Sequence, residues 1–320
     1  MRTPEDPSES ELIAAHCWEA DDEIPRDPAM TRFRRRIRYN HALWREAAGH
    51  PIGTQPIKPR PGQAARPVGS RLDLDYARET GATFVTARAL DAARSRTSFV
   101  ESNQSLDHQR LWADLLWSPA LAFNLFGDLA TDLARADRAV HAWWPDTPGR
   151  VSEVRFVHSP GWLDPAYLNS LRAFDTTFVL TLDDGTRGIV GIDVKYHERS
   201  KAEIPKPENL RRYLEVAERS RVFRPNSTDA VKGRSDLAVM WLEHLLLQSI
   251  LQHPTGSWTW GRYVVIHPAD NSDVADECVR YRRILADGSS FASMTLERVL
   301  EAGALPATTT AALRDRYLPD

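Results

Sequence analysis

The stretch Gly188–Glu198, GIVGIDVKYHE, is typical of a β-strand that crosses a protein core. Successive side chains of a strand point to opposite faces of its sheet, so Asp193, Lys195 and His197 are expected to share one face. Val190, Ile192, Val194 and Tyr196 are expected to share the other face. Leaving one buried charge without its partner costs about 3–5 kcal/mol. The charged face of this strand therefore needs a chemical reason.

Lysine is rare in this chain. Of 41 basic Lys and Arg residues, five are lysines: Lys58, Lys195, Lys201, Lys206 and Lys232. A lysine ammonium is compact and reorients easily, whereas the guanidinium of arginine is planar and essentially never deprotonated. However, an acidic residue two positions before a lysine is expected about 0.7 times by chance in a chain of this composition. Asp193 and Lys195 alone therefore leave a structural ion pair as the alternative to a functional one.

The segment before this stretch predicts the other half of a β-hairpin. Ala173–Gly188, AFDTTFVLTLDDGTRG, is rich in Phe, Val, Thr and Leu and ends in the turn residues Asp183, Asp184 and Gly185. A three-residue turn with glycine in the left-handed position would pair the residues on either side of it. In that register, Asp175 lies directly opposite Asp193.

Two carboxylates that face each other across antiparallel strands repel, because their Cβ atoms are about 5 Å apart. A divalent cation between them removes the repulsion. Mg²⁺ and Mn²⁺ prefer oxygen ligands and keep several waters, so two carboxylates and a backbone carbonyl or a third acid suffice. We expect Asp175 and Asp193 to hold the metal, with Lys195 orienting a water or stabilising charge on a phosphorane. A register slip of one residue would send Asp175 to the other face.

These residues resemble the active-site signature of the PD-(D/E)XK nuclease superfamily, in which an Asp precedes a hairpin that ends in Asp-Val-Lys. The segments LLWSPALAFNLFGDL, VRFVHSPGW, FDTTF and IDVKYHE are similar in order and spacing to a bacterial, restriction-endonuclease-like branch of that superfamily. The similarity runs from about Val68 to Pro268. It implies catalytic roles for Asp175, Asp193 and Lys195.

The resemblance implies an α/β fold with the order α-β-β-β-α-β and a mixed sheet flanked by helices. The sequence predicts each part: a helix over Pro119–Ala139, a strand over Val151–His158, the hairpin, a helix over Glu208–Val222 and a fourth strand that Pro268 ends. We expect residues 71–320 to form this nuclease domain with helical additions. Residues 1–70 would be an N-terminal extension with an acidic tip, a basic helical arm and a Pro- and Gly-rich linker or extended strap.

Further candidate ligands have ordinary alternatives. The superfamily often carries a glutamate ahead of the signature, where this chain has Val157. Glu153 shares a strand face with Val157 and is a metal-ligand candidate in its place, or an exposed charge at a strand end. Glu198 resembles a family acid and is a candidate ligand of a second metal or partner of Lys195, or a surface glutamate.

Three polar residues near these motifs are expected to have structural roles. His197 is a solvated strand-end histidine in this interpretation. His244 and Gln248 lie one turn apart on a helix that is apolar nearly all round, and we expect them to be satisfied core groups.

Composition predicts a soluble, cytoplasmic enzyme with no membrane partner. At 320 residues and 42% hydrophobic, the chain can bury one large core or two modest ones. No apolar stretch reaches the length of a membrane span, and the N-terminus is polar and acidic, unlike a signal peptide. Cys17 and Cys278 show no metal-binding spacing.

Charge is unevenly distributed along the chain. Residues 1–25 hold one arginine against eight acids, residues 26–100 hold 15 basic residues against six acids, and residues 199–235 hold ten against five. Basic segments of this kind attract nucleic-acid phosphates. We expect DNA contacts from arginines of the arm and of the helix after the signature, unless the arm is a solvated amphipathic helix: Arg34, Arg35, Arg36, Arg38, Arg211 and Arg212.

The sequence thus predicts a Mg²⁺- or Mn²⁺-dependent phosphodiesterase acting on DNA, including the restriction or defence type of endonuclease. DNA rather than RNA follows from the resemblance alone. One alternative is a catalytically inactive nuclease-fold protein that binds DNA or assembles a complex, and a second is an RNase or a structure-specific nuclease. We also consider a homodimer.

Overall fold

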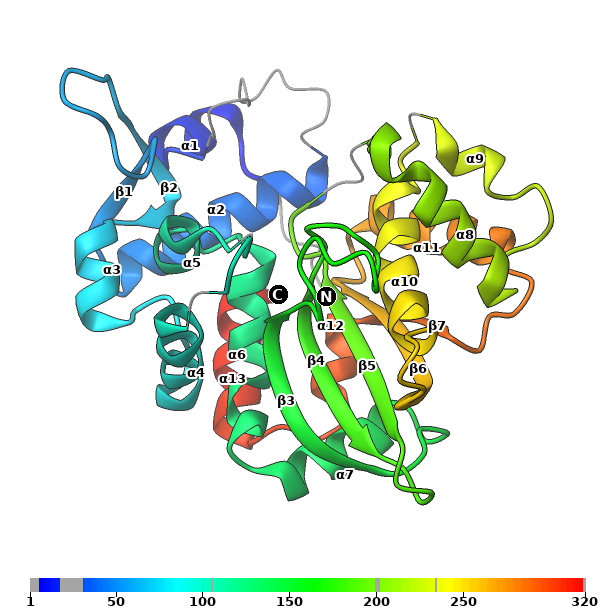
Figure 1. Cartoon of the computed structure of the whole chain (residues 1–320). Coiled ribbons are helices and arrows are strands. Elements are labelled where there is room, and N and C mark those ends of the chain that lie inside the picture. The colour runs from blue at the N-terminus through cyan, green and yellow to red at the C-terminus, as the bar shows by residue number, and fades with distance from the viewer. Residues whose placement is uncertain are drawn as a thin grey trace. The chain divides into compact units, whose positions relative to one another are not determined.

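The computed structural model describes residues 6–17, 31–99, 101–104, 106–198, 202–233 and 235–318. The chain divides into two compact units that interleave along the sequence (Figure 1). The first comprises Met1–Ala93, Leu106–Gly127 and Pro306–Asp320, and the second comprises Arg94–Ser105 and Asp128–Leu305. The expected boundary near residue 70 stays a prediction, and most of the acidic tip lies outside the described residues.

The first unit is mainly helical. The segment expected to be a linker or strap contributes two antiparallel strands, in which Gly53 pairs with Val68. The elements of this unit, of which α4 and α6 continue into the second, are α1 (Glu9–Ala14), α2 (Arg32–Ala47), β1 (Ile52–Gln55), β2 (Arg66–Leu72), α3 (Leu74–Thr80), α4 (Ala87–Ser98), α5 (His108–Ala113), α6 (Ser118–Ala130) and α13 (Ala307–Tyr317).

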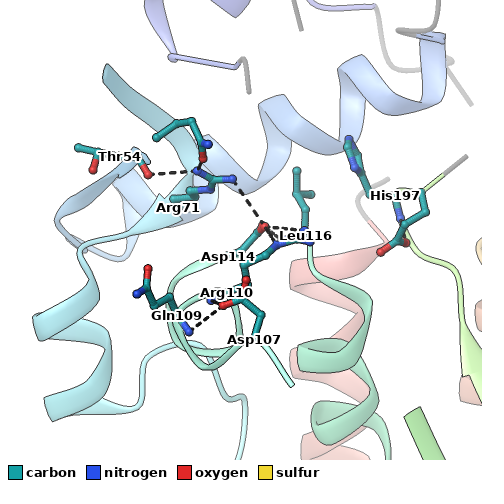
Figure 2. Close-up of polar contacts among 10 residues, drawn as sticks. Thr54, Arg71, Asp107, Gln109, Arg110, Asp114, Leu116 and His197 are labelled. Carbon is teal, nitrogen blue, oxygen red and sulfur yellow. Dashed lines mark hydrogen bonds and ion pairs between the residues drawn. The ribbon is translucent and has the colours of Figure 1, made fainter. Parts of the chain in front are cut away.

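A buried ion network joins β2 to α5 in this unit (Figure 2). Asp114 is fully buried and accepts from Arg110 Nε at 3.1 Å and from Leu116 N at 3.1 Å. Arg71, also buried, approaches Asp114 to 3.9 Å and donates to Thr54 O at 3.1 Å. The charge of Asp114 is thus compensated on both sides, as burial requires.

The second unit contains the nuclease-like sheet. Its strand order is β3-β4-β5-β6-β7; β3, β4 and β5 are antiparallel, and β6 and β7 continue parallel to β5. The predicted α/β fold with a mixed sheet and flanking helices is confirmed. The elements are α7 (Leu133–Trp143), β3 (Arg150–His158), β4 (Phe174–Thr181), β5 (Arg187–Val194), η1 (Pro207–Asn209), α8 (Leu210–Ser220), α9 (Asp229–Lys232), α10 (Ala238–Leu251), β6 (Trp258–His267), α11 (Ser272–Ile284), β7 (Phe291–Thr295) and α12 (Leu296–Glu301).

The predicted hairpin register is confirmed. Thr176 pairs with Ile192 and Thr177 with Gly191. The turn closes through Leu182 N donating to Thr186 O at 2.9 Å, and Gly185 has φ 81°. That left-handed φ favours glycine, which has no Cβ to clash. A local turn signal therefore set the alignment of the whole hairpin.

Apolar side chains on one sheet face form the main core of this unit with α8, α10 and α11. Val179, Ile189, Tyr263 and Val265 belong to this core. Gly191 lies on the same face, and a Cβ there would come within 2.7 Å of the Phe174 ring. Opposite, Trp143 of α7 contacts Phe178 of β4 at a ring distance of 6.4 Å. In Figure 1, α7 and α10 accordingly lie beside the sheet.

The predicted single helix over Pro119–Ala139 is wrong. The structure has two helices, α6 and α7, because the chain turns at Thr131 and Asp132. Asp132 caps α7: its Oδ1 accepts from Arg135 N at 3.0 Å, and such a side-chain bond competes with a continuous helix. No helix within the described residues is long and apolar enough to cross a bilayer.

Candidate active site

Asp175 and Asp193 come together at the end of the hairpin. Asp193 lies on β5, and Asp175 lies one residue beyond the last backbone pair of the ladder, opposite Asp193. Asp175 Oδ2 accepts from Val194 N at 2.8 Å, so a side chain continues the ladder where backbone pairing stops. Burial raises the pKa of Asp175 well above its ordinary value, and the charge of Asp193 raises it further. The two carboxylates therefore repel each other, as expected.

Lys195 is bound to Asp193 of this pair. Its Nζ lies 2.9 Å from Asp193 Oδ1 and 2.8 Å from Oδ2. Burial lowers the pKa of Lys195, but the charges of Asp193 and Asp175 outweigh burial, so the net shift is upward. The lysine therefore stays an ammonium at working pH. It can orient a water or stabilise negative charge, but it cannot remove a proton.

Tyr263 is a member of the site that the sequence did not reveal. It lies on β6, beside β5, and its hydroxyl donates to Asp193 Oδ2 at 3.2 Å. Burial raises the pKa of Tyr263 well above its ordinary value, so the hydroxyl keeps its proton and remains a donor. Asp193 is thus held by Lys195 on one side and by Tyr263 on the other.

Glu243 of α10 was also missed. It is 6% exposed; its Oε1 accepts from Arg172 Nη1 at 3.4 Å, and its Oε2 has no hydrogen-bond partner within the described residues. Burial raises the pKa of Glu243 to about 7, Arg172 opposes that rise, and the charge of Asp193 adds to it. Arg172 also pairs with Glu203. An acid in a helix that is apolar nearly all round was the available signal for Glu243.

Glu198 follows the strand and lies near the pair, because its charge raises the pKa values of both Asp175 and Lys195. Its backbone carbonyl and that of Tyr196 each accept from Asn271 Nδ2 at 3.1 Å. Asn271, at the start of α11, therefore holds the segment that carries Lys195. Strand β5 ends at Val194, so the alternation used to place His197 on the catalytic face does not reach it. His197 is 7% exposed, so the expectation that it is solvated is wrong.

Glu153 is not brought to the carboxylate pair. It lies opposite Val179, four residues along β4 from Asp175, and is exposed and bidentate with Arg155 at 2.6 Å. Val157, the expected place of a family acid, does lie opposite Asp175, with a left-handed φ of 45°. The structure therefore favours an exposed strand charge for Glu153 over a role as a metal ligand.

His244 and Gln248 are core groups, as predicted. His244 shares hydrogen bonds with Tyr281 Oη at 3.1 Å and Ser290 Oγ at 2.9 Å, and its Nε2 lies 3.4 Å from Gln248 Nε2. Both residues are buried.

The six arginines proposed for DNA contact differ in exposure. Arg34, Arg35 and Arg36 are half-buried on α2, and Arg211 is exposed on α8. Arg38 is 1% exposed, so we correct its assignment: packing, not solvent, surrounds it. Arg212 is turned toward its own unit, donating from Nε to Tyr167 O at 2.8 Å and from Nη2 to Ala166 O at 3.2 Å. It is likewise removed from the DNA-contacting set.

The donor set at the hairpin end fits a hydrated magnesium ion. Among the described residues, no group of three His, Cys, Asp or Glu side chains is arranged to hold a metal. Mg²⁺ does not require one, since it is commonly bound through one or two carboxylates, several waters and substrate phosphate. The mutual repulsion of Asp175 and Asp193 is the feature a cation would relieve.

Comparison with known families agrees with this geometry. A sequence model of the PD-(D/E)XK nuclease superfamily matches residues 27–319, and the chain belongs to that superfamily. Its members are nucleases that generally use divalent metals, although inactive members occur. Neither the curated proteins nor the solved structures contain a match.

The Tyr263 hydroxyl can be tested against a matched tyrosine. Tyr263→Phe removes a donor to a charged carboxylate, a bond worth about 1.5 kcal/mol, so we expect kcat for nucleic-acid cleavage to fall about tenfold. Tyr281→Phe removes a hydroxyl of the same core, whose hydrogen-bond partner within the described residues is His244. It should reduce thermal stability and leave kcat near wild type. Equal kcat in the two variants would contradict the role of Tyr263.

Glu277 of α11 should make the free energy of unfolding depend on pH. It is 4% exposed, and burial raises its pKa to about 8, with Lys195 opposing the shift. A folded-state pKa above the unfolded one means that Glu277 favours folding below about pH 4.5 and loses that contribution as pH rises through 8. Glu277→Gln should therefore gain about 2–5 kcal/mol over wild type at pH 9 and nothing near pH 4. Urea unfolding at both pH values measures this, and an equal gain at both would contradict it.

Proposed function

We propose that the chain is a Mg²⁺- or Mn²⁺-dependent phosphodiesterase that hydrolyses DNA. The observation that carries the proposal is the alignment of Asp175 and Asp193, with Lys195 bound to Asp193. Superfamily membership supports the reaction class. In this proposal Asp175 and Asp193 hold the metal, which would lower the pKa of a bound water and neutralise the scissile phosphate. For its biological role we propose that of a restriction or defence endonuclease.

The chain's own groups define the remaining roles. The Lys195 ammonium orients the attacking water and stabilises the negative charge that develops on the phosphorane oxygens. Tyr263 fixes Asp193, and Asn271 fixes the segment that carries Lys195. Because Lys195 stays protonated, the proton of the attacking water goes to solvent or to a phosphate oxygen.

An inactive nuclease-fold protein that binds DNA or assembles a complex is the second candidate. The absence of a third ligating acid among the described residues favours it. The assay that separates the candidates incubates purified protein with plasmid, linear duplex, single-stranded DNA and RNA, each with Mg²⁺, with Mn²⁺ and with EDTA. Cleavage of DNA only with metal supports the proposal, cleavage of RNA alone supports an RNase, and binding without cleavage supports the inactive protein.

DNA binding should depend steeply on salt. The retained arginines Arg34, Arg35, Arg36 and Arg211 would neutralise about four phosphates, so log K should fall against log salt with a slope of about −4. The triple variant Arg34→Glu, Arg35→Glu, Arg36→Glu should flatten that slope by about 3 and weaken binding more than tenfold.

The matched control reverses three exposed arginines elsewhere in the same unit: Arg78, Arg88 and Arg314. It changes net charge equally and should alter the slope little. Fluorescence anisotropy of a labelled duplex from 50 to 300 mM NaCl, roughly the range over which such contacts weaken, measures both slopes. Identical salt slopes for the two triple variants would mean that α2 does not contact DNA and serves only in packing.

We further propose a cytoplasmic location. Cys17 and Cys278 are both free thiols, and burial raises the pKa of each to about 12, so neither is a reactive thiolate.

A further inference from the structure

Arg96, near the end of α4, binds two successive backbone carbonyls of β3. Its Nε donates to Phe156 O at 2.8 Å and its Nη2 to Val157 O at 3.0 Å. Nη1 donates to Phe99 O at 2.7 Å, and Nη2 also pairs with Glu101. The Arg96 side chain is 11% exposed, so these charge-assisted bonds form largely out of water, where they are strong.

The backbone at Val157 is in a costly conformation. Its φ of 45° is left-handed, which a β-branched residue adopts only when its surroundings impose it. Successive carbonyls of a regular strand point to opposite edges. Here one guanidinium reaches the carbonyls of both Phe156 and Val157, so the alternation is interrupted at Val157. Arg96 binds both carbonyls of the interrupted segment.

Val157 lies opposite Asp175. Phe156 pairs with Thr176 and His158 pairs with Phe174, so the residue between them faces the proposed ligand. Strand β3 is the edge of the described sheet, which leaves Arg96 and not another strand on its outer side. If Val157 relaxed to an extended backbone, its peptide group would rotate. The pairing of β3 with β4 beside Asp175 would then change.

We propose that Arg96 is a positioning residue of the active site. It holds Val157 in the left-handed conformation and thereby fixes the end of β4 that carries Asp175. Arg96 touches neither metal nor substrate in this proposal and acts through the backbone. The proposal rests on the ligand role of Asp175 in the proposed function.

The test is a double-mutant cycle in the full chain. Arg96→Met removes every donor, and we expect it to weaken Mn²⁺ binding to the free protein about tenfold by calorimetric titration. Val157→Gly removes the steric cost of the left-handed backbone. The double variant should therefore recover most of that affinity. Arg96→Lys should fall between wild type and Arg96→Met, because a single ammonium does not reproduce the fork of a guanidinium.

The matched control is Arg45→Met. Arg45 also donates to two backbone carbonyls, Gly69 O and His50 O, each at 2.9 Å, in the first unit. It should lower thermal stability without changing Mn²⁺ affinity. Folded Arg96→Met protein with wild-type affinity would overturn the proposal, and so would a loss that Val157→Gly fails to recover.

Amide hydrogen exchange over residues 155–158 and 174–176 gives a readout that needs no metal. Arg96→Met should speed exchange there at least tenfold, and adding Val157→Gly should slow it again. If the wild-type protein binds no Mn²⁺, the ligand role of Asp175 fails, and exchange alone decides whether Arg96 orders the strand end. Unchanged exchange in Arg96→Met rejects the positioning role in either case.

Discussion

Asp193→Ala is expected to abolish metal binding and cleavage together. Asp193 meets Asp175 at the hairpin end and accepts from both Lys195 and Tyr263. One remaining carboxylate holds a hydrated Mg²⁺ poorly, so Mn²⁺ affinity should fall below detection in calorimetry. Cleavage should fall by about 10³-fold or more, since both metal and water activation are lost. The side-chain charge is the critical property, so Asp193→Asn should behave almost as Asp193→Ala although it keeps the shape.

The matched control for this variant is Asp146→Ala. Asp146 forms a bidentate pair with Arg262 of β6, at 2.8 and 2.6 Å, and within the described residues no hydrogen bond or ion pair links it to Asp193. Its removal should lower the melting temperature and leave Mn²⁺ affinity unchanged. An Asp193→Ala protein that binds Mn²⁺ as tightly as Asp146→Ala would remove Asp193 from the metal site.

Lys195→Ala is expected to separate chemistry from binding. In the proposed function, its ammonium acts on the attacking water and on the developing charge, whereas the carboxylates would hold the metal. Mn²⁺ affinity and DNA affinity should therefore persist, and turnover should fall about 10²-fold or more, as when a preorganised electrostatic group is lost. Lys195→Met, which keeps most of the aliphatic stem, should lose as much activity. Single-turnover cleavage at saturating metal measures the chemical step directly.

Lys232→Met provides the comparison for Lys195. Lys232 also pairs with an aspartate, Asp229, at 2.7 Å, but on the surface of α9. Exposed pairs of this kind contribute about 0–1 kcal/mol, so this variant should retain both stability and turnover. If the Lys195–Asp193 pair were only structural, Lys195→Ala would lower stability and keep full activity per folded molecule. Full activity in folded Lys195→Ala protein would reject the catalytic assignment.

Local chemistry made the hairpin predictable. The register followed from a turn of three residues with glycine in the left-handed place, and strand alternation then placed Asp175 opposite Asp193. Neither step needs information from elsewhere in the chain. Strands β3 and β6 were likewise predictable, because each is a bounded run of β-forming residues.

Contacts between distant segments were not predictable. Tyr263 reaches Asp193 through parallel pairing of β5 with β6, and nothing in the sequence around either residue indicates that alignment. Glu243 lies on the apolar helix α10 beside His244 and Gln248. Nothing in the local pattern distinguishes Glu243 from these two core groups. Arg38 was assigned to DNA contact from its basic neighbours, but helical periodicity places it on the packed face with Ile37 and His41.

The hydrophobic pattern of the sequence also did not predict where helices end or where the backbone is strained. An unbroken apolar repeat predicted one helix where capping by Asp132 divides it in two. The left-handed Val157 could not be predicted, because intrinsic preference opposes that conformation and a distant arginine supports it.

The turn at Asp183–Gly185 has a consequence for how such a hairpin can change in length. The turn alone fixes which residues lie opposite each other, so one added residue there would displace Asp175 relative to Asp193 by a whole position and turn it to the other face. Paired insertions, one in each strand, would lengthen the hairpin and keep the two acids aligned. The long crossover between β5 and β6 has no such restriction. Length variation among natural or engineered versions of this chain should therefore appear in the crossover and be nearly absent from the turn.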